Sequence, residues 1–411
     1  MPDVSFTSLL VVAVVAVLAP LLLGYLPGLR IPAVVLEIIV GVALGPAGLG
    51  WIAVDLPVQV TGILGLAFLL FLAGLEIDLR ALRGPSLGLA VAGYGVTLVL
   101  GLGAGLVAHA AGSVQSVILL AIALSATSLG LVVPVLKDAG VLASEVGQVT
   151  VAAATVADFA AILLLSLAFS TSGGGVGERL VLLAVFVLLV AAVAAAALAA
   201  GRSMRLGDVL SRLQDTTAEI RVRLAVLLLI AFVVLAQRFG LESILGAFLA
   251  GAVVALVDAD AASHPRFRVK LEAIGYGFLV PVFFISSGAK LDVGGLLHTP
   301  SALIAVPLYL LALLLVRAAP AWLHLRTLGR RATLAAGLLQ ATSLPFIVTA
   351  TQIGVATGRI APVTATELVF AGLLSVLIFP AVALSLLRPA PVSGQRASGP
   401  PEPSNGVVTP S

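Results

Sequence analysis

Hydrophobic residues run along this chain in long blocks, and short polar or turn-rich stretches separate the blocks. A block of about 20 apolar residues spans the hydrocarbon core of a bilayer as a helix, and a helix satisfies its own backbone hydrogen bonds there. The pattern therefore predicts an all-α polytopic membrane protein with thirteen transmembrane helices. We place them at residues 5–25, 31–53, 58–79, 86–110, 114–136, 147–170, 179–201, 220–238, 242–258, 272–290, 299–323, 331–354 and 362–388.

The first block has no basic n-region and no clear cleavage site, so we expect a retained helix rather than a signal peptide. Composition supports a membrane protein, because 61% of the residues are hydrophobic and 10% are charged, against about 45–50% and about 25% in soluble domains. The polar stretches at 202–221 and 258–272 are too short for a soluble catalytic domain. We predict a membrane domain over 1–388 and a disordered cytoplasmic tail over 389–411.

The sequence lacks the signatures of enzyme and metal chemistry. There is no Cys, which excludes disulfides and thiolate metal sites. We find no Walker-type loop, no GxSxG and no paired DxD, and the histidines show no metal-ligand spacing. These histidines are His109, His264, His298 and His324. The chain is predicted not to be an enzyme and to need no cofactor.

Lys and Arg residues set the expected orientation, because cytoplasmic loops retain them. With the N-terminus outside and the C-terminus inside, most of the basic residues fall in the inner segments. Only a few remain outside, namely Arg179, Arg238, Lys290 and Arg359. An error in the helix count would scramble this alternation, so the asymmetry also favours thirteen spans.

Two short strings recur in the same order at nearly the same offset. Residues 74–79 (GLEIDL) resemble 288–293 (GAKLDV), and 126–129 (ATSL) return at 341–344. The offset equals an odd number of the predicted spans, so the second copy would cross the membrane inverted. Inverted repeats with a site between them are typical of secondary transporters. The alternative is coincidence in a sequence rich in Leu, Ala and Val.

Within this repeat, the fifth and twelfth spans carry small hydroxyl residues beside Gly or Pro, at 125–130 with Pro134 and at 340–345. Such segments favour unwound helices that expose carbonyls and hydroxyls to a cation. The candidate groups are Thr127, Ser128, Thr342 and Ser343. Alternatively, the hydroxyls bond their own helix backbone and Pro produces an ordinary kink.

Asp158 lies at the centre of the sixth predicted span, with apolar or small residues on both sides. A carboxylate at that depth costs about 2.5–3.5 kcal/mol on insertion scales, so it faces a cavity or a partner. A single carboxylate that holds either a proton or a cation can exchange the two. The alternative is a structural Asp that is hydrogen-bonded inside the bundle.

Four more of the charged residues within or near the ends of spans are considered for a role. Arg317 is predicted either to pair with Asp158 or to snorkel to the interface. Glu37 and Glu76 are candidate residues of an ion path, although Glu76 also fits an interfacial structural role. Glu367 is predicted to be either a solvated helix end or a charge near a helix N-terminus.

Together these segments resemble the Kef-type and sodium/proton branch of the monovalent cation:proton antiporters. The resemblance rests on residues 35–46, 68–78, 123–128, the Asp158 helix and 281–288. It implies a thirteen-helix, inverted-repeat fold with a core domain, a dimerisation domain and two crossing unwound helices. It also implies that Asp158 binds the transported Na⁺ or K⁺ and the proton, that Thr127 and Ser128 belong to the unwound segment, and that Arg317 occupies a basic position.

One residue departs from the family pattern. Family members often have Asp, Asn or Gln before the essential aspartate, where this chain has Ala157. That favours one-for-one, electroneutral exchange and leaves the identity of the cation open.

We therefore expect a homodimeric Na⁺/H⁺ or K⁺/H⁺ antiporter of the cytoplasmic membrane that serves pH homeostasis and has no nucleic-acid partner. A cation efflux channel, a sodium-coupled symporter of an organic solute and a transport-inactive subunit remain alternatives.

Overall fold

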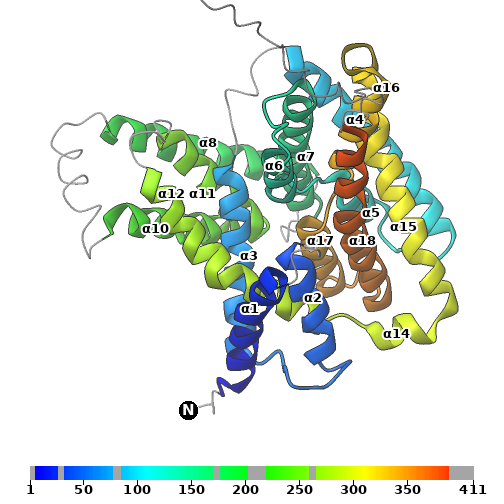
Figure 1. The fold of residues 1–411 in the computed structure, drawn as a ribbon. Helices are drawn as coiled ribbons and strands as arrows, with labels where there is room; N and C mark the ends of the chain where they lie inside the picture. Colours follow the sequence, from blue (N-terminus) through cyan, green and yellow to red (C-terminus); the bar gives the residue numbers. More distant parts are fainter. Residues whose placement is uncertain are drawn as a thin grey trace, which may run out of the picture.

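A computed structural model gives the fold, and it describes residues 5–25, 32–76, 85–169, 176–201, 219–258 and 265–387. The predicted tail at 389–411 and most of the polar stretch at 202–221 lie outside these ranges. The described residues are almost entirely helical (Figure 1).

The helices fall into two groups according to their contacts. The scaffold group holds α1 (Thr7–Tyr25), α2 (Ala33–Leu44), α3 (Leu56–Leu75), α8 (Val176–Gly201), α10 (Ile220–Arg238), α11 (Ser243–Val257), α12 (Pro265–Ile274) and α13 (Val280–Ala289). The core group holds α4 (Pro85–Ala110), α5 (Val117–Ser125), α6 (Leu129–Asp138), α7 (Glu145–Phe169), α15 (Pro300–Ala318), α16 (Leu325–Gln340), α17 (Pro345–Ala356) and α18 (Pro362–Leu387). The short helix α14 (Val293–His298) connects them, and the two groups lie side by side in Figure 1.

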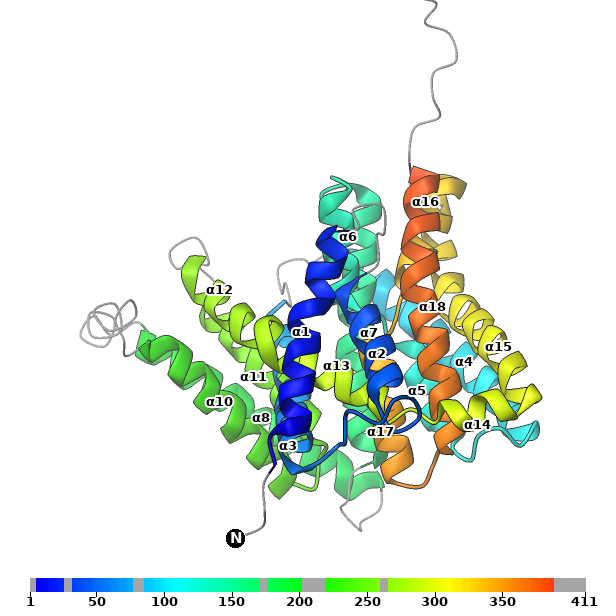
Figure 2. The same cartoon turned by 60° about the horizontal axis from the view of Figure 1, so that its bottom comes forward.

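The helix count agrees with the prediction of thirteen spans. Ten helical stretches in the described ranges are long and apolar enough to cross a membrane. One of these stretches, Pro300–Ala356, contains both α15 and the interrupted pair α16 and α17, while α2 and α11 are shorter apolar helices. In Figure 2 the start of α1 and α14 lie toward the lower end of the molecule, and the last turn of α18 lies at the upper end. Opposite ends are what an odd number of crossings requires.

Two predicted spans have different bounds in the structure. The span placed at 31–53 is helical only to Leu44, because Gly45 and Pro46 end α2 and Gly50 adopts a positive φ of 69°. The span placed at 272–290 begins earlier, at Pro265, so part of the polar stretch 258–272 is helix. A π-helical turn, Gly275–Leu279, joins α12 to α13 within this span.

Glycines allow the scaffold helices to pack backbone against backbone. A Cβ atom at Gly74 or Gly251 would collide with a main-chain carbonyl across the contact between α3 and α11, and one at Gly41 would collide with the carbonyl of Ile285 in α13. In lipid the hydrophobic effect does not drive membrane helices together, so their association depends on close packing, which small residues allow. The scaffold group is therefore closely packed at these contacts.

Candidate functional site

Two interrupted helices cross at the centre of the core group. One interruption lies between α5 and α6 and the other between α16 and α17. The Ser128 N–H donates to the Thr342 carbonyl at 3.0 Å, and the Thr127 hydroxyl donates to the Gln340 carbonyl at 2.8 Å. The interruptions fall on the repeated strings 126–129 and 341–344. The predicted pair of crossing, unwound helices is thus confirmed.

Local sequence explains both interruptions. Ala126 and Ser128 adopt extended backbone conformations, and the Gly and hydroxyl residues beside them offer the chain alternatives to helical hydrogen bonds. In the second segment, Leu344 precedes Pro345, and a residue before proline is disfavoured in the helical region. Pro345 then opens α17 at a position where its missing N–H costs nothing.

Asp158 of α7 faces the first interruption. Its two carboxylate oxygens accept hydrogen bonds from the N–H groups of Thr127 and Leu129, each at 3.2 Å. These N–H groups belong to the interruption and to the first turn of α6, where helical partners are lacking and the helix dipole favours negative charge. The carboxylate therefore acts as a cap for a half-helix in the middle of the membrane domain.

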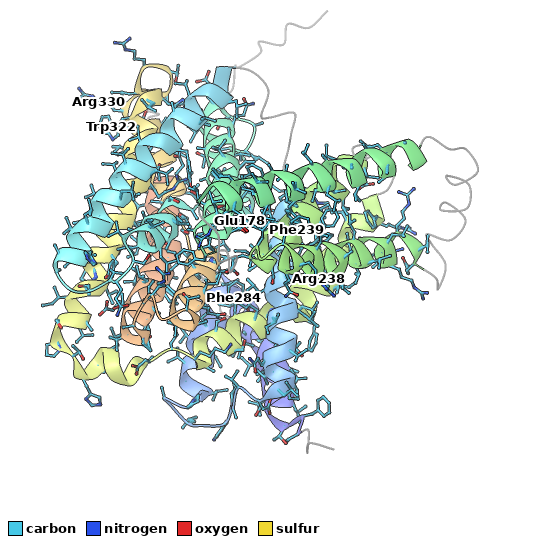
Figure 3. All side chains as sticks on the ribbon, turned by 180° about the vertical axis from the view of Figure 1, so that it is seen from behind. Glu178, Arg238, Phe239, Phe284, Trp322 and Arg330 are labelled. Carbon is cyan, nitrogen blue, oxygen red and sulfur yellow. The ribbon has the colours of Figure 1, made fainter. Side chains whose placement is uncertain are left out.

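A small cavity of about 70 Å³ surrounds this carboxylate. Its wall includes Asp158, Thr127 and Ser128 from the core group, and Glu76, Tyr276 and Phe284 from the scaffold group. Figure 3 places Phe284 near the middle of the molecule, away from Trp322 and Arg330 at one end.

A large cavity of about 1290 Å³ adjoins it, between α6, the first third of α7, α12 and the start of α16. The two cavities share four lining residues, which are Glu76, Leu129, Gly130 and Tyr276. The small cavity therefore borders directly on the large one.

Arg317 of α15 is buried, with 2% of its surface exposed, which is not the position of a snorkelling side chain. Its guanidinium donates to the Gln340 carbonyl and to the Thr97 hydroxyl, both at 3.3 Å, and to the Thr127 hydroxyl. Among the described residues no ion pair joins Arg317 to Asp158; instead both contact Thr127. The sequence left direct pairing and snorkelling open; the structure buries Arg317 and links the two charges through this threonine.

The second interruption is held by a neutral side chain. The hydroxyl of Ser375 in α18 accepts from the Ser343 N–H at 3.2 Å and lies 3.1 Å from the Ser343 carbonyl, to which it can donate. The Thr342 hydroxyl donates to the Leu338 carbonyl in the last turn of α16, and among the described residues the buried Ser343 hydroxyl has no hydrogen-bond partner.

Sequence reasoning missed both Ser375 and Thr97. A signal for Ser375 existed, because the repeat offset of 215 carries position 158 to 373, two residues before this serine. No comparable signal marked Thr97, a buried hydroxyl in an apolar helix.

The three glutamates singled out from the sequence have different surroundings. Glu76 ends α3 and lines both the large and the small cavity, and one of its carboxylate oxygens is buried without a hydrogen-bond partner among the described residues. Glu37 is buried in α2 and lines neither of these cavities. Glu367 was expected to be either a solvated helix end or a charge near a helix N-terminus; the structure places it in the first half of α18 and buries it there. Within the described ranges no three His, Asp or Glu residues gather as a metal-binding group.

The fold and the site define an all-helical membrane transporter built around two crossed, unwound helices. Residues 11–387 match the family described as "Sodium/hydrogen exchanger, transmembrane". The chain belongs to this family.

Individual relatives agree with this assignment. The chain is 33% identical over 373 residues to the "Putative Na(+)/H(+) antiporter YjbQ" of Bacillus subtilis, covering 86% of this chain and 58% of that protein. It is 31% identical over 271 residues to the Na(+)/H(+)-K(+) antiporter GerN of Bacillus cereus, covering 64% of this chain and 67% of GerN. The chain thus spans little more than half of YjbQ.

A solved structure shares the fold. The sodium proton antiporter MjNhaP1 from Methanocaldococcus jannaschii superposes with a TM-score of 0.63 at 17% identity, over 92% of this chain and 97% of that one. At this identity the likeness concerns the fold alone.

Proposed function

We propose that this protein exchanges Na⁺ or K⁺ for H⁺ across the cytoplasmic membrane, with Asp158 as the shared carrier of cation and proton. The observation that supports this most directly is the position of the Asp158 carboxylate. It lines a small cavity at the crossing of two unwound helices, and that cavity borders a large cavity at one end of the molecule. The relatives named as Na⁺/H⁺ antiporters support the same activity.

The chemistry follows from one carboxylate in a poorly hydrated place. A carboxylate there is stabilised either by a proton or by a nearby cation, and each ligand displaces the other. Ala157, which is fully buried beside Asp158, adds no second acidic group. One negative charge then carries one positive charge in each direction, so the exchange is electroneutral.

Alternating access supplies the transport step. The small cavity borders the large cavity, so its ion would reach only that side in the present conformation. Movement of the core group against the scaffold group would expose it to the other side. We propose that the scaffold group also forms a homodimer, that the N-terminus lies outside, and that the large cavity faces the cytoplasm, as the basic residues predict.

Cavity size weighs against the alternative of an organic-solute symporter. Sites for small organic ligands usually enclose about 300–1,000 Å³, and the cavity at Asp158 holds about 70 Å³. That volume suits a monovalent ion with a few ligating groups or waters. A channel would need a continuous path from the small cavity to both sides.

Transport by purified protein in proteoliposomes tests this proposal. Addition of Na⁺ or K⁺ should drive counter-movement of protons, followed by a trapped pH dye, without generating a membrane potential. Asp158→Asn should abolish the exchange, because an amide cannot alternate between a proton and a cation. Glu178→Gln is the matched control, since it removes an exposed carboxylate from the first turn of α8. Undiminished exchange in Asp158→Asn, or no exchange by the unmodified protein, would refute the proposal.

A further inference from the structure

A third cavity, of about 400 Å³, lies at the other end of the span that contains α12 and α13. Along this span, Arg268 and Glu272 line the large cavity, Tyr276 and Phe284 line the small cavity, and Ser287 and Lys290 line the third. The three cavities therefore follow one another across the membrane domain. We call the third one the Lys290 cavity.

The Lys290 cavity lies between the two helix groups. Its wall combines the end of α13 with the second half of α17 and the first turns of α18. It shares no lining residue with the small cavity around Asp158, and the buried Phe284 stands in the same span between them. In the present conformation, the Lys290 cavity is therefore separated from the ion site.

Two hydrogen bonds join neighbouring segments at this closed side. The Gln352 amide of α17 donates to the Ser287 hydroxyl of α13 at 2.7 Å. The Asp292 N–H, just before α14, donates to the Thr366 hydroxyl of α18 at 2.9 Å. Three of the four residues that form these bonds also line the cavity, namely Ser287, Gln352 and Thr366. Movement of the core group would have to break these contacts to open the cavity toward Asp158.

The cavities differ in charge. The large cavity is lined by Glu76, Glu145 and Glu272 against Lys137 and Arg268. The Lys290 cavity has a single charged residue in its wall, Lys290, and no carboxylate. Lys290 is exposed, and among the described residues its ammonium has no hydrogen-bond acceptor and no ion-pair partner.

We propose that Lys290 determines the affinity for the transported cation on the side of the membrane opposite the large cavity. When the core group moves and the Gln352–Ser287 contact opens, a cation would travel between Asp158 and solvent through the Lys290 cavity. The ammonium would lower the local cation concentration along that route. The inference rests on the proposed exchange activity and adds a difference in cation affinity between the two sides of the membrane.

The expected effect is moderate and depends on salt. A unit charge several ångströms from the route, in a partly hydrated cavity, changes cation occupancy by roughly two- to fivefold. Because the route is open to solvent when it is used, added salt should weaken the effect. Loss of a merely structural lysine would instead change folding or the rate from both sides.

The test measures the two sides separately. The protein is reconstituted in proteoliposomes in one known orientation, or the protein in one orientation is inactivated by selective proteolysis. Na⁺ is then added on one side or the other, and the apparent KM and kcat are determined for each side. Lys290→Gln should lower the KM for Na⁺ on the side of the Lys290 cavity roughly two- to fivefold, with the KM on the large-cavity side unchanged. Lys290→Glu should lower it further, and Lys290→Arg should retain the wild-type value. Choline chloride should reduce the difference between Lys290→Gln and wild type.

Arg238→Gln is the matched control, because Arg238 is an exposed basic residue at the end of α10 that lines none of the three cavities. It should leave both KM values unchanged. The inference would be overturned if Lys290→Gln had the wild-type KM for Na⁺ on both sides. It would also be overturned if the substitution shifted the KM equally on both sides. Either result leaves the proposed exchange intact, whereas absence of Na⁺-driven proton movement in wild type would refute the exchange itself.

Discussion

The two interrupted helices occupy equivalent places in the repeat but are stabilised by different chemistry. At the first interruption, the Asp158 carboxylate accepts from two backbone N–H groups. At the second, the neutral Ser375 hydroxyl contacts the backbone of Ser343, while Arg317 donates to the carbonyl of Gln340 at the end of α16. An acid therefore lies at a helix start and a base at a helix end, as the helix dipole favours in each case.

This difference separates the two roles. Arginine stays protonated in proteins, so Arg317 is suited to hold the crossing in one geometry throughout a cycle. An aspartate can gain or lose a proton, so in the proposed exchange the carrier is the acid at the first interruption. Under that proposal the fold duplicates the architecture, and one copy carries the exchangeable charge.

Replacing the acid with the hydroxyl of the second interruption should have the largest effect. In Asp158→Ser the first interruption keeps a small polar group near α6 but loses its charge. We expect cation-driven proton movement in proteoliposomes to fall to the level of empty liposomes. The variant should still purify as a folded protein, judged by size-exclusion chromatography. Substantial remaining exchange would show that the charge at the first interruption is not the carrier.

Removal of the Arg317 guanidinium should have the second-largest effect. Arg317→Ala deletes donors to Thr97, Thr127 and Gln340, and hydrogen bonds to charged groups contribute about 1.5–3 kcal/mol each when their partners remain buried. We expect a clear drop in the detergent melting temperature together with a large loss of transport.

Arg317→Lys sharpens this prediction, because an ammonium keeps the charge but cannot reproduce the planar set of donors. It should recover transport only in part. If Arg317→Ala melts like wild type, the guanidinium does not hold the two interruptions together.

Loss of the neutral cap should have a smaller effect. Ser375→Ala removes the contacts to the Ser343 backbone, and such bonds contribute about 1 kcal/mol each. Transport rates should fall severalfold while the apparent KM for the cation changes little, since Ser375 lies outside the wall of the small cavity. A change in KM alone, without a change in rate, would place Ser375 at the ion site instead.

Removing single hydroxyls from the two interruptions should have the smallest effects, and the effect should be larger at Thr127 than at Thr342. Thr127 bonds across the crossing and lines the small cavity, whereas the Thr342 hydroxyl bonds within α16. Thr127→Ala should weaken apparent cation affinity severalfold, consistent with the loss of about 1 kcal/mol. Thr342→Ala should stay close to wild type. Equal effects of the two substitutions would remove the distinction between the interruptions at the level of hydroxyl groups.

The fold could be predicted from the sequence to a large extent, because membrane insertion imposes strong rules on it. Long apolar blocks and basic loops indicated the number of spans, and the repeated strings at 126–129 and 341–344 indicated where two of them are interrupted. The early start of α12 was missed, since its polar residues Arg268 and Glu272 line a cavity rather than a loop. Hydropathy alone cannot distinguish these two environments.

The candidate site could be predicted only in part. Asp158, Thr127 and Ser128 stood out because a charge or a run of hydroxyls is unusual in an apolar helix. The link from Arg317 through Thr127 to Asp158 depends on side-chain geometry across three helices. Ser375 looks like many other serines in membrane helices, and only its place opposite Ser343 gives it a role.

The glycine contacts in the scaffold group have a consequence for the kinetics of the whole protein. Because α3 and α11 meet through Gly74 and Gly251 with their main chains in contact, little internal movement is open to this pair of helices. In the proposed alternating access, these two helices would then move as one unit relative to the core group. The activation enthalpy of turnover would report chiefly the contacts between the two groups, such as Gln352 with Ser287. Substitutions there would alter the slope of an Arrhenius plot, whereas substitutions at the glycines would lower the yield of folded protein.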